Sequence, residues 1–138
     1  MTGFPVNVVL DASALLALMR EEPGAERVDE AIERGAAISA VNWAEVLSKL
    51  SETGRDPETA AARALPASNS GAGGLTLVAF DDEQARAAAR LRNRTRSLGL
   101  SLADRAALAL AQLRGLPVLT TDRAWRSLRL SVRIEVIR

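Results

Sequence analysis

VNVVLDASALLALM, residues 6–19, begins with a short apolar run and places an acid in its middle. The β-branched segment Asn7–Leu10 predicts a buried strand, the turn-forming sequence DAS ends it, and a helix should follow from about Ala12. A buried carboxylate without a partner costs several kcal/mol. The sequence must therefore give Asp11 a helix to cap, a hydrogen-bonding partner or a metal ion.

The rest of the chain continues the alternation of strands and helices. Strands are predicted at 36–40, 75–80, 116–121 and 131–137, and helices at 24–35, 42–54, from 57, 81–99, 101–115 and 122–128. The small-residue stretch PASNSGAGG, residues 66–74, is predicted to be a flexible loop. Strands that alternate with helices indicate a mainly parallel sheet covered on both faces, and 138 residues are enough for a single domain, residues 1–138.

The composition excludes several kinds of site. The chain has no Cys, His or Tyr, and Lys49 is its only lysine. Zinc sites, Cys nucleophiles, Ser-His-Asp triads and histidine acid–base pairs are therefore excluded. The remaining carboxylates favour a hard cation such as Mg²⁺ or Mn²⁺ if a metal is bound. No apolar run approaches the ~18 residues that cross a bilayer, and the N-terminus does not resemble a signal peptide, so we expect a cytoplasmic protein without membrane contact.

Four acids differ from the others because their near neighbours are apolar: Asp11, Glu45, Asp104 and Asp122. Local roles are available for each of them. Asp11 and Asp122 each stand where they could cap the helix that follows. The segments 42–45 and 101–104 have the spacing of a capping box, and Glu45 could pair with Lys49 one turn later.

The positions of these acids favour a shared site. Asp11, Glu45 and Asp122 each follow a predicted strand, and parallel α/β sheets bind their ligands at the carboxyl ends of the strands. Carboxylates that meet there repel one another and raise each other's pKa unless a cation neutralises them. A divalent metal ion held by carboxylates and water would remove this conflict.

The segments VVLDASALLALM, NWAEVLSKL and LSLADRAALALAQLRGLPVLTTDRAW together resemble a PIN domain of the VapC toxin type over essentially the whole chain. The resemblance implies a three-layer α/β/α sandwich and a Mg²⁺- or Mn²⁺-dependent endoribonuclease. It also implies a homodimer and a small VapB-like antitoxin that blocks the acidic pocket. By position, the four acids match the acidic quartet of the family, and the polar residues that accompany it are matched by Ser13, Thr121 and, more weakly, Asn42.

The chemistry expected from this resemblance is hydrolysis of an RNA phosphodiester by a metal-activated water. Asp11 and Asp104 are expected to be the direct metal ligands, with Glu45 and Asp122 acting through water or at a second metal. Arginines are expected to bind the RNA because guanidinium groups grip phosphate. The candidates are Arg90, Arg92, Arg94, Arg96 and Arg105, although a solvated helix face would explain the same run.

Two other functions are compatible with the sequence. One is a PIN-fold module that binds proteins without catalysis. The other is an aspartate-nucleophile phosphatase of the haloacid dehalogenase type, which also places an Asp after its first strand. That site needs a second acid two residues later, where this chain has Ser13, and a catalytic lysine. Metal-dependent RNA cleavage would distinguish the nuclease from both.

Overall fold

The computed structural model describes residues 5–65 and 74–138. A five-stranded sheet with the order β3-β2-β1-β4-β5 lies at its centre, and all of its neighbouring strands are parallel. The strands are β1 (Val8–Leu10), β2 (Ala36–Ser39), β3 (Leu75–Val78), β4 (Val118–Thr120) and β5 (Ile134–Val136). The helices α1 to α4 are Ala12–Met19, Ala25–Arg34, Ala40–Glu52 and Pro57–Ala64, and α5, η1, α6 and η2 are Asp82–Arg94, Arg96–Leu98, Leu102–Arg114 and Arg123–Ser127.

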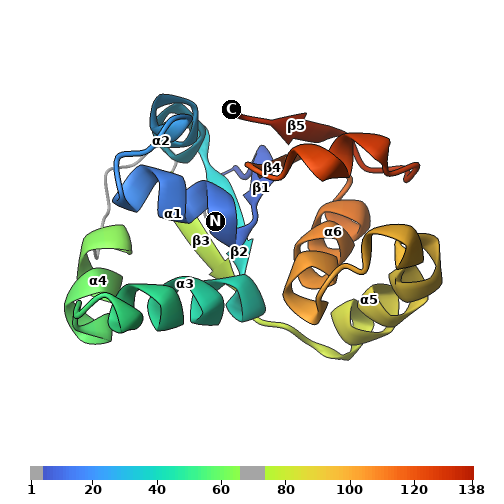
Figure 1. Ribbon diagram of the computed structural model, residues 1–138, viewed down its shortest axis with the longest axis horizontal. Coiled ribbons are helices and arrows are strands. Elements are labelled where there is room, and N and C mark those ends of the chain that lie inside the picture. The colour runs from blue at the N-terminus through green and yellow to red at the C-terminus, as the bar shows by residue number, and fades with distance from the viewer. Residues whose placement is uncertain (1–4, 66–73) are drawn as a thin grey trace.

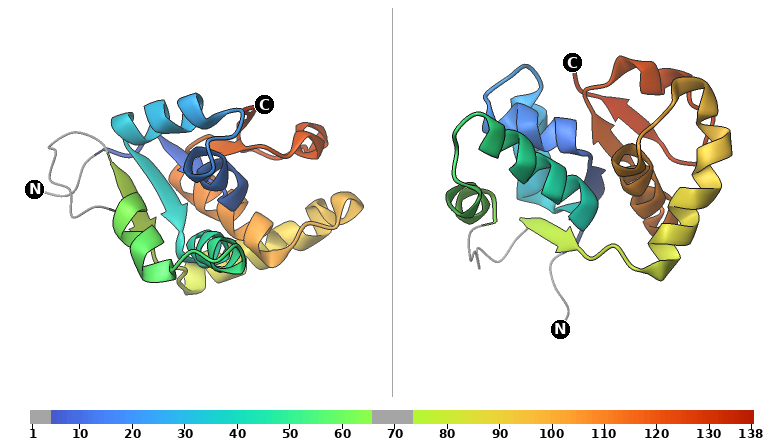
Figure 2. Two further views of the ribbon diagram at one scale, coloured as in Figure 1. Left: turned by 60° about the vertical axis from the view of Figure 1, so that its left-hand side comes forward. Right: turned by 60° about the horizontal axis from the view of Figure 1, so that its bottom comes forward.

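Helices cover both faces of the sheet, so the expected three-layer α/β/α arrangement is confirmed. Helices α1 to α4 (blue to green) lie on one side, and α5 and α6 (yellow to orange) lie on the other (Figures 1 and 2). Within β1, Val8 and Leu10 belong to the core beneath α1 to α4, while Val9 belongs to the core beneath α5 and α6. This division follows from the strand itself, whose successive side chains point to opposite faces.

The expected elements are present, and most differ from the predicted boundaries by one to three residues. The predicted helix at 81–99 is divided into α5 and η1, because Thr95 ends α5 and Gly99, with φ 59°, ends η1. Asp81 caps α5 by accepting a hydrogen bond from the Gln84 amide. The predicted loop at 66–74 lies, apart from Gly74, outside the described residues.

One of the two predicted capping boxes is wrong. Helix α3 begins at Ala40 rather than at Asn42, because the Ser39 hydroxyl at the end of β2 accepts a hydrogen bond from the Val41 amide and turns the chain directly into the helix. Asn42 and Glu45 therefore lie inside α3. The other box is confirmed: the Ser101 hydroxyl accepts from the Asp104 amide, and the Asp104 carboxylate accepts from the Ser101 amide.

Both tryptophans lie in the core. Trp43 packs with the core beneath α1 to α4, and Trp125 packs with the core beneath α5 and α6. No helix in the described parts of the chain is both long and apolar enough to cross a membrane.

Candidate functional site

Asp11 lies at the carboxyl end of the central strand β1 and is 4% exposed. Its amide continues the sheet by donating to the Leu119 carbonyl of β4 at 3.2 Å. Its carboxylate caps α1 by accepting from the Ala14 amide at 2.8 Å. The predicted cap is therefore real, but a cap at the surface would serve α1 equally well and does not explain why the carboxylate is buried.

Two hydroxyl groups hold the Asp11 carboxylate in one orientation. Ser13 Oγ donates to Oδ1 at 2.7 Å, and Thr120 Oγ1 donates to Oδ2 at 2.5 Å. Each hydroxyl is itself fixed by a backbone amide, because the Thr121 amide donates to Ser13 Oγ at 2.9 Å and the Asp122 amide donates to Thr120 Oγ1 at 3.1 Å. The turn after β4 is thereby tied to the carboxylate that follows β1.

The Thr120 hydroxyl contacts Asp11 but is not among the residues predicted from the sequence. Thr121 was the predicted supporting residue, but it contributes its backbone amide, whereas the buried Thr120 at the end of β4 contacts Asp11 through its side chain. The sequence contains a signal for this role, because Thr120 is the last residue of the buried strand β4. A fully buried hydroxyl at the last position of a strand needs a hydrogen-bonding partner.

Burial raises the pKa of the Asp11 carboxyl from its ordinary value of 3.8 to about 6. The hydrogen bonds from Thr120, Ser13 and the Ala14 amide lower this pKa, and the negative charge of Asp104 raises it further. Within the described residues, no lysine or arginine forms an ion pair with Asp11. The ionised carboxylate is thus desolvated, lies near another acid and lacks a positive partner.

Asp104 lies in the first turn of α6 and is half-buried. Its Oδ2 accepts from the Ser101 amide at 3.1 Å, which fixes the side chain at the N-terminal end of the helix. Helix α6 packs against α3. The two acids that were expected to be direct ligands are therefore close enough for the charge of Asp104 to act on Asp11.

The other two predicted acids lie on adjoining elements. Glu45 is half-buried on α3 and does not form the predicted ion pair with Lys49. Asp122 is exposed and caps η2 by accepting from the Ala124 amide at 2.9 Å. Over residues 5–65 and 74–138, no three acidic side chains are grouped closely enough to form a metal site.

Asn42 connects the two helices that border the site. It is 1% exposed on α3, and its Nδ2 donates to the Ala103 carbonyl in the first turn of α6 at 2.9 Å. Its Oδ1 is buried and has no hydrogen-bonding partner among the described residues. This unsatisfied buried oxygen next to Asp104 could coordinate a hard cation or accept a hydrogen bond from a water molecule.

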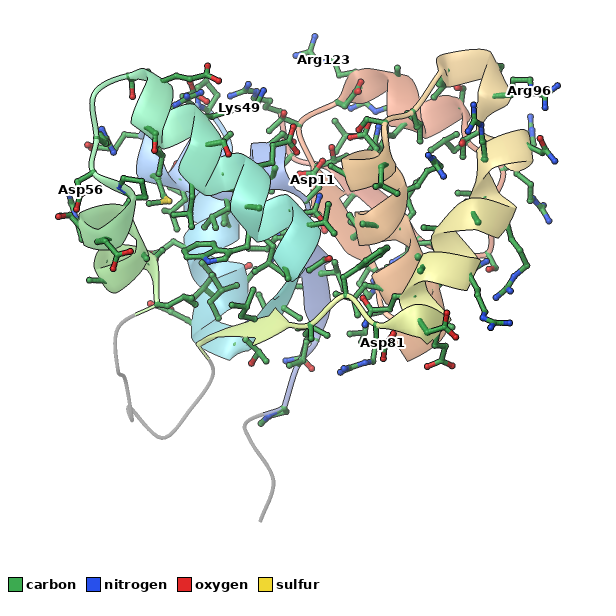
Figure 3. The ribbon with its side chains drawn as sticks, turned by 90° about the horizontal axis from the view of Figure 1, so that it is seen from below. Asp11, Lys49, Asp56, Asp81, Arg96 and Arg123 are labelled. Atoms are coloured by element: carbon green, nitrogen blue, oxygen red, sulfur yellow. The ribbon has the colours of Figure 1, made fainter. Side chains whose placement is uncertain are left out.

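Figure 3 shows Asp11 between α3 (teal) and α6 (orange), at the ends of the central strands. Residues 8–129 match the sequence pattern of the PIN domain. This chain belongs to the PIN domain family. The predicted family is confirmed, and the match covers all four candidate acids.

Solved structures share the fold of this PIN domain. A toxin-antitoxin complex from Klebsiella pneumoniae is similar with a TM-score of 0.68 and 21% identity, over 93% of this chain and 100% of that chain. The sarcin-ricin loop cleaving toxin VapC20 from Mycobacterium tuberculosis is similar with a TM-score of 0.69 and 16% identity, over 92% of this chain and 99% of that chain. VapBC-5 from the same organism is similar with a TM-score of 0.62 and 25% identity, over 97% of this chain and 99% of that chain. The search of curated proteins found no match.

The residues of this PIN domain fit a hard divalent cation. Asp11 supplies a buried carboxylate without a positive partner, Asp104 supplies a second carboxylate, and Asn42 supplies a free amide oxygen. Mg²⁺ is commonly held by one or two carboxylates and several waters rather than by a complete protein cage. The two nearby carboxylates are consistent with that preference.

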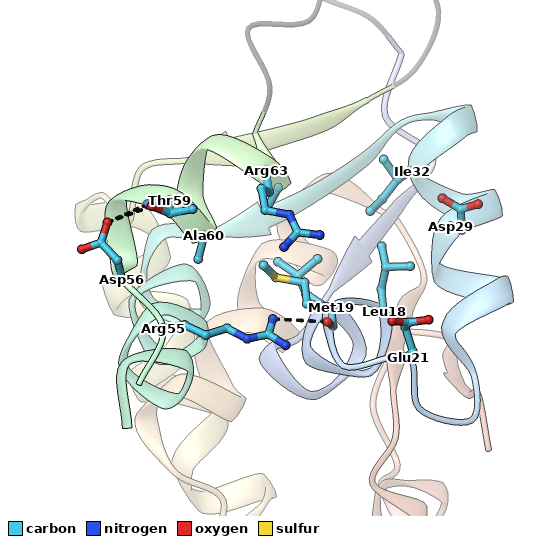
Figure 4. Close-up of a pocket in the computed structure, with 12 residues that line it drawn as sticks. Leu18, Met19, Glu21, Asp29, Ile32, Arg55, Asp56, Thr59, Ala60 and Arg63 are labelled. Atoms are coloured by element: carbon cyan, nitrogen blue, oxygen red, sulfur yellow. Dashed lines mark hydrogen bonds between the residues drawn. The ribbon is translucent and has the colours of Figure 1, made fainter. Parts of the chain in front are cut away.

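A groove of about 680 Å³ lies away from these acids, between α1, α2 and α4. Its lining includes the apolar Leu15, Leu18, Met19, Ile32, Ala60 and Ala64. Figure 4 shows Arg55 and Arg63 on one side of the groove and Glu21 and Asp29 on the other.

Proposed function

We propose that this chain is a Mg²⁺- or Mn²⁺-dependent endoribonuclease, the toxin of a toxin–antitoxin pair, and that residues 1–138 form a single nuclease domain acting in the cytoplasm. The observation that carries the proposal is the Asp11 carboxylate, which is buried beside Asp104 without a positive partner. A carboxylate in that setting is costly in a purely structural role, because a neutral cap would bind the same amide at lower cost. Membership of the PIN family supports the nuclease assignment.

In the proposed mechanism, Asp11 and Asp104 would hold the cation, and Glu45 on α3 and Asp122 after β4 would act through water or at a second metal. Ser13 and Thr120 keep both oxygens of Asp11 oriented, which lowers the cost of assembling the site when the substrate arrives. When bound, a divalent cation supplies an activated water and positive charge opposite the phosphate. The protein supplies no imidazole that could act as acid or base.

The ends of the RNA products test this mechanism. Without histidine, we expect attack by water rather than by the RNA 2′-hydroxyl, so the products should carry no 2′,3′-cyclic phosphate. A 2′-deoxy substitution at the cleaved position should leave cleavage intact. Both are measured by mass spectrometry and gel electrophoresis of a cleaved oligonucleotide. Cyclic phosphate ends would contradict the proposed mechanism, and a complete lack of cleavage of every RNA tested would favour a non-catalytic binding module.

The family resemblance implies a small VapB-like antitoxin that wraps the chain and blocks the acidic pocket. We propose that the groove between α1, α2 and α4, away from that pocket, binds an amphipathic segment of the same antitoxin. Its apolar lining suits one face of a helix, and Arg55 and Arg63 suit acidic side chains at the edge of that helix. The solved complexes with this fold include toxin–antitoxin pairs. The family resemblance also implies a homodimer, and that expectation stays a prediction.

Arg63→Glu should weaken binding of the antitoxin about tenfold, because it places a negative charge opposite the acidic edge of the partner. Arg34→Glu is the matched control, since Arg34 is also exposed in the last turn of a helix but does not line the groove. Binding is measured by calorimetry with the product of the small reading frame expected immediately upstream. Equal affinities for the two variants would exclude this groove as the binding site.

A further inference from the structure

The two halves of this chain carry opposite charge. Residues 79–138 contain twelve arginines and six carboxylates, whereas residues 1–78 contain five arginines, Lys49 and eleven carboxylates. The net charge of +1 therefore conceals an excess of six positive charges in the second part and five negative charges in the first. Such asymmetry is a recognised indication of contact with nucleic acid.

The folded chain keeps these charges apart. The acidic part forms α1 to α4, and the basic part forms α5, η1, α6, η2 and the last two strands, on the other side of the molecule (Figure 1). The candidate site lies where the two parts meet, since Asp11 follows β1 and Asp104 begins α6. The charge separation is thus a property of the surface on either side of the acids.

Six arginines form what we call the cationic face: Arg90, Arg92, Arg94, Arg96, Arg126 and Arg129. All are exposed, and within the described residues none forms an ion pair. Arg86, one turn earlier on α5, differs because it pairs with Asp82 at 2.8 Å. No carboxylate within ion-pair distance neutralises these six charges in the described residues, so together they leave a positive potential on this face.

The cationic face joins two segments that are distant in sequence. Arg94 Nη2 donates to the Arg129 carbonyl at 3.4 Å, which places the end of α5 beside the segment after η2. Figure 3 shows the guanidinium groups projecting outward along α5, with Arg96 labelled at the end of this row. Short connections lead from this face to the acids, because Asp104 lies six residues beyond Leu98 and Asp122 directly precedes η2.

One predicted RNA contact has another role in the structure. Arg105 is half-buried, and its Nη1 donates to the Ala88 carbonyl of α5 at 2.9 Å. Its Nε is buried and finds no hydrogen-bonding partner within the part of the chain that the structure describes. Arg105 is therefore not part of the cationic face. Arg126 and Arg129, which were not predicted from the sequence, belong to it.

We propose that the cationic face binds the phosphate backbone of the RNA substrate and guides a single strand towards Asp11 and Asp104; this inference rests on the proposed function. Base stacking contributes little here because Trp43 and Trp125 are 8% and 0% exposed. Exposed arginines form charge-assisted contacts with phosphates whatever the base, so the phosphate backbone is the main feature that this face can bind. Binding through this face should therefore be insensitive to sequence and strongly dependent on salt.

The test compares two double variants that remove the same charge. Arg92→Gln with Arg129→Gln alters both segments of the cationic face, and Arg20→Gln with Arg34→Gln alters exposed arginines of the acidic half. Both are made together with Asp11→Asn so that RNA is bound without being cut. Fluorescence anisotropy with a single-stranded RNA is measured over a series of KCl concentrations.

We expect the first variant to bind RNA on the order of tenfold more weakly at low salt. The slope of log K against log salt should fall by about 1.4, because each phosphate contact on a single strand contributes about 0.7. The Arg20 and Arg34 variant should bind as its parent does. Equal losses in the two variants, or no loss in the first, would overturn the proposal, as would tighter binding of duplex DNA through the same arginines.

Cleavage by the same double variants without the Asp11 change separates this inference from the proposed function. If the chain cuts RNA, the first variant should raise KM with kcat unchanged, since the arginines contact substrate away from the reacting phosphate. If RNA is cut but the variant binds and cuts as the unaltered chain does, the cationic face fails and the nuclease stands. If no RNA is cut but the variant loses RNA binding, the nuclease fails and the cationic face stands.

Discussion

Asp11→Asn should lower the rate of RNA cleavage by a factor on the order of a thousand or more. Asparagine has nearly the same shape but no charge, so it cannot neutralise a cation as the carboxylate does. The loss of rate should exceed that of any arginine variant, because the arginines are proposed to contact the substrate away from the reacting phosphate. Asp11 is also the most deeply buried of the four acids. Cleavage of a labelled oligonucleotide under single-turnover conditions measures the effect.

Asp56→Asn is the matched control for this substitution. Asp56 is also an N-cap, and its carboxylate accepts from the Thr59 amide at 3.0 Å, but it is exposed and lies at the start of α4 away from the strand ends. We expect its cleavage rate to remain within about twofold of the unaltered chain, since the loss of a helix cap costs only about 1 kcal/mol of stability. Full activity in the Asp11 variant would remove the acidic site from the mechanism.

The stability of the unaltered chain should depend on pH in the direction set by the raised pKa of Asp11. The pKa of Asp11 is about 6 in the folded chain and 3.8 ordinarily, so between these values the folded state binds more protons than the unfolded state. The free energy of unfolding of the unaltered chain should therefore fall as the pH rises from about 4 to about 6, and remain lower above that range. A shift of this size corresponds to about 3 kcal/mol.

Asp11→Asn removes the buried negative charge and with it the loss of folding stability at high pH. In the presence of chelator at pH 8, the Asp11→Asn chain should be more stable than the unaltered chain by up to about 3 kcal/mol, and the gain should disappear near pH 4. Urea unfolding at several pH values measures it, and also shows that the inactive variant is folded. A destabilised variant at pH 8 would mean that the hydrogen bonds from Ser13 and Thr120 outweigh the desolvation of the charge.

The sequence was sufficient for the order and type of the elements. An apolar run such as Val8–Leu10 followed by a capping acid has few alternatives to a buried strand that enters a helix, and both signals are local. The same holds for Asp81 and Ser101, whose side chains cap the helices that they precede. Local chemistry and the tertiary fold agree at these positions, so the prediction needed no knowledge of packing.

The details of the site depended on packing and could not be predicted from the sequence. Thr120 and Thr121 are adjacent and identical, and only the sheet decides that Thr120 turns inward to Asp11. The start of α3 at Ala40 depends on where β2 leaves the sheet, which moves Asn42 from a predicted cap to a contact with α6. That the carboxylates lie at the strand ends was predictable, but the distances between Glu45, Asp122 and the central pair were not.

Chelation should abolish cleavage completely, and Mg²⁺ or Mn²⁺ should restore it. The reason is the same unbalanced charge: Asp11 and Asp104 repel one another, and without a cation no positive charge is available to stabilise the phosphate during attack by water. Cleavage that resists chelator would indicate either a mechanism without metal or a contaminating nuclease. The Asp11→Asn preparation distinguishes them, because a contaminant would remain in it and activity of this chain would not.

Thermal unfolding gives a readout of the metal that does not depend on activity. Mn²⁺ at about a hundred times its dissociation constant should stabilise the unaltered chain by about 2.7 kcal/mol, since a ligand that binds only the folded state stabilises it by mass action. The effect should be larger at pH 8 than at pH 5, because Asp11 with a pKa of about 6 is mostly protonated at pH 5 and the proton competes with the cation. Asp11→Asn should lose most of the stabilisation at both pH values, and Asp56→Asn should keep it. An equal rise in melting temperature in all three chains would place the bound metal elsewhere on the molecule.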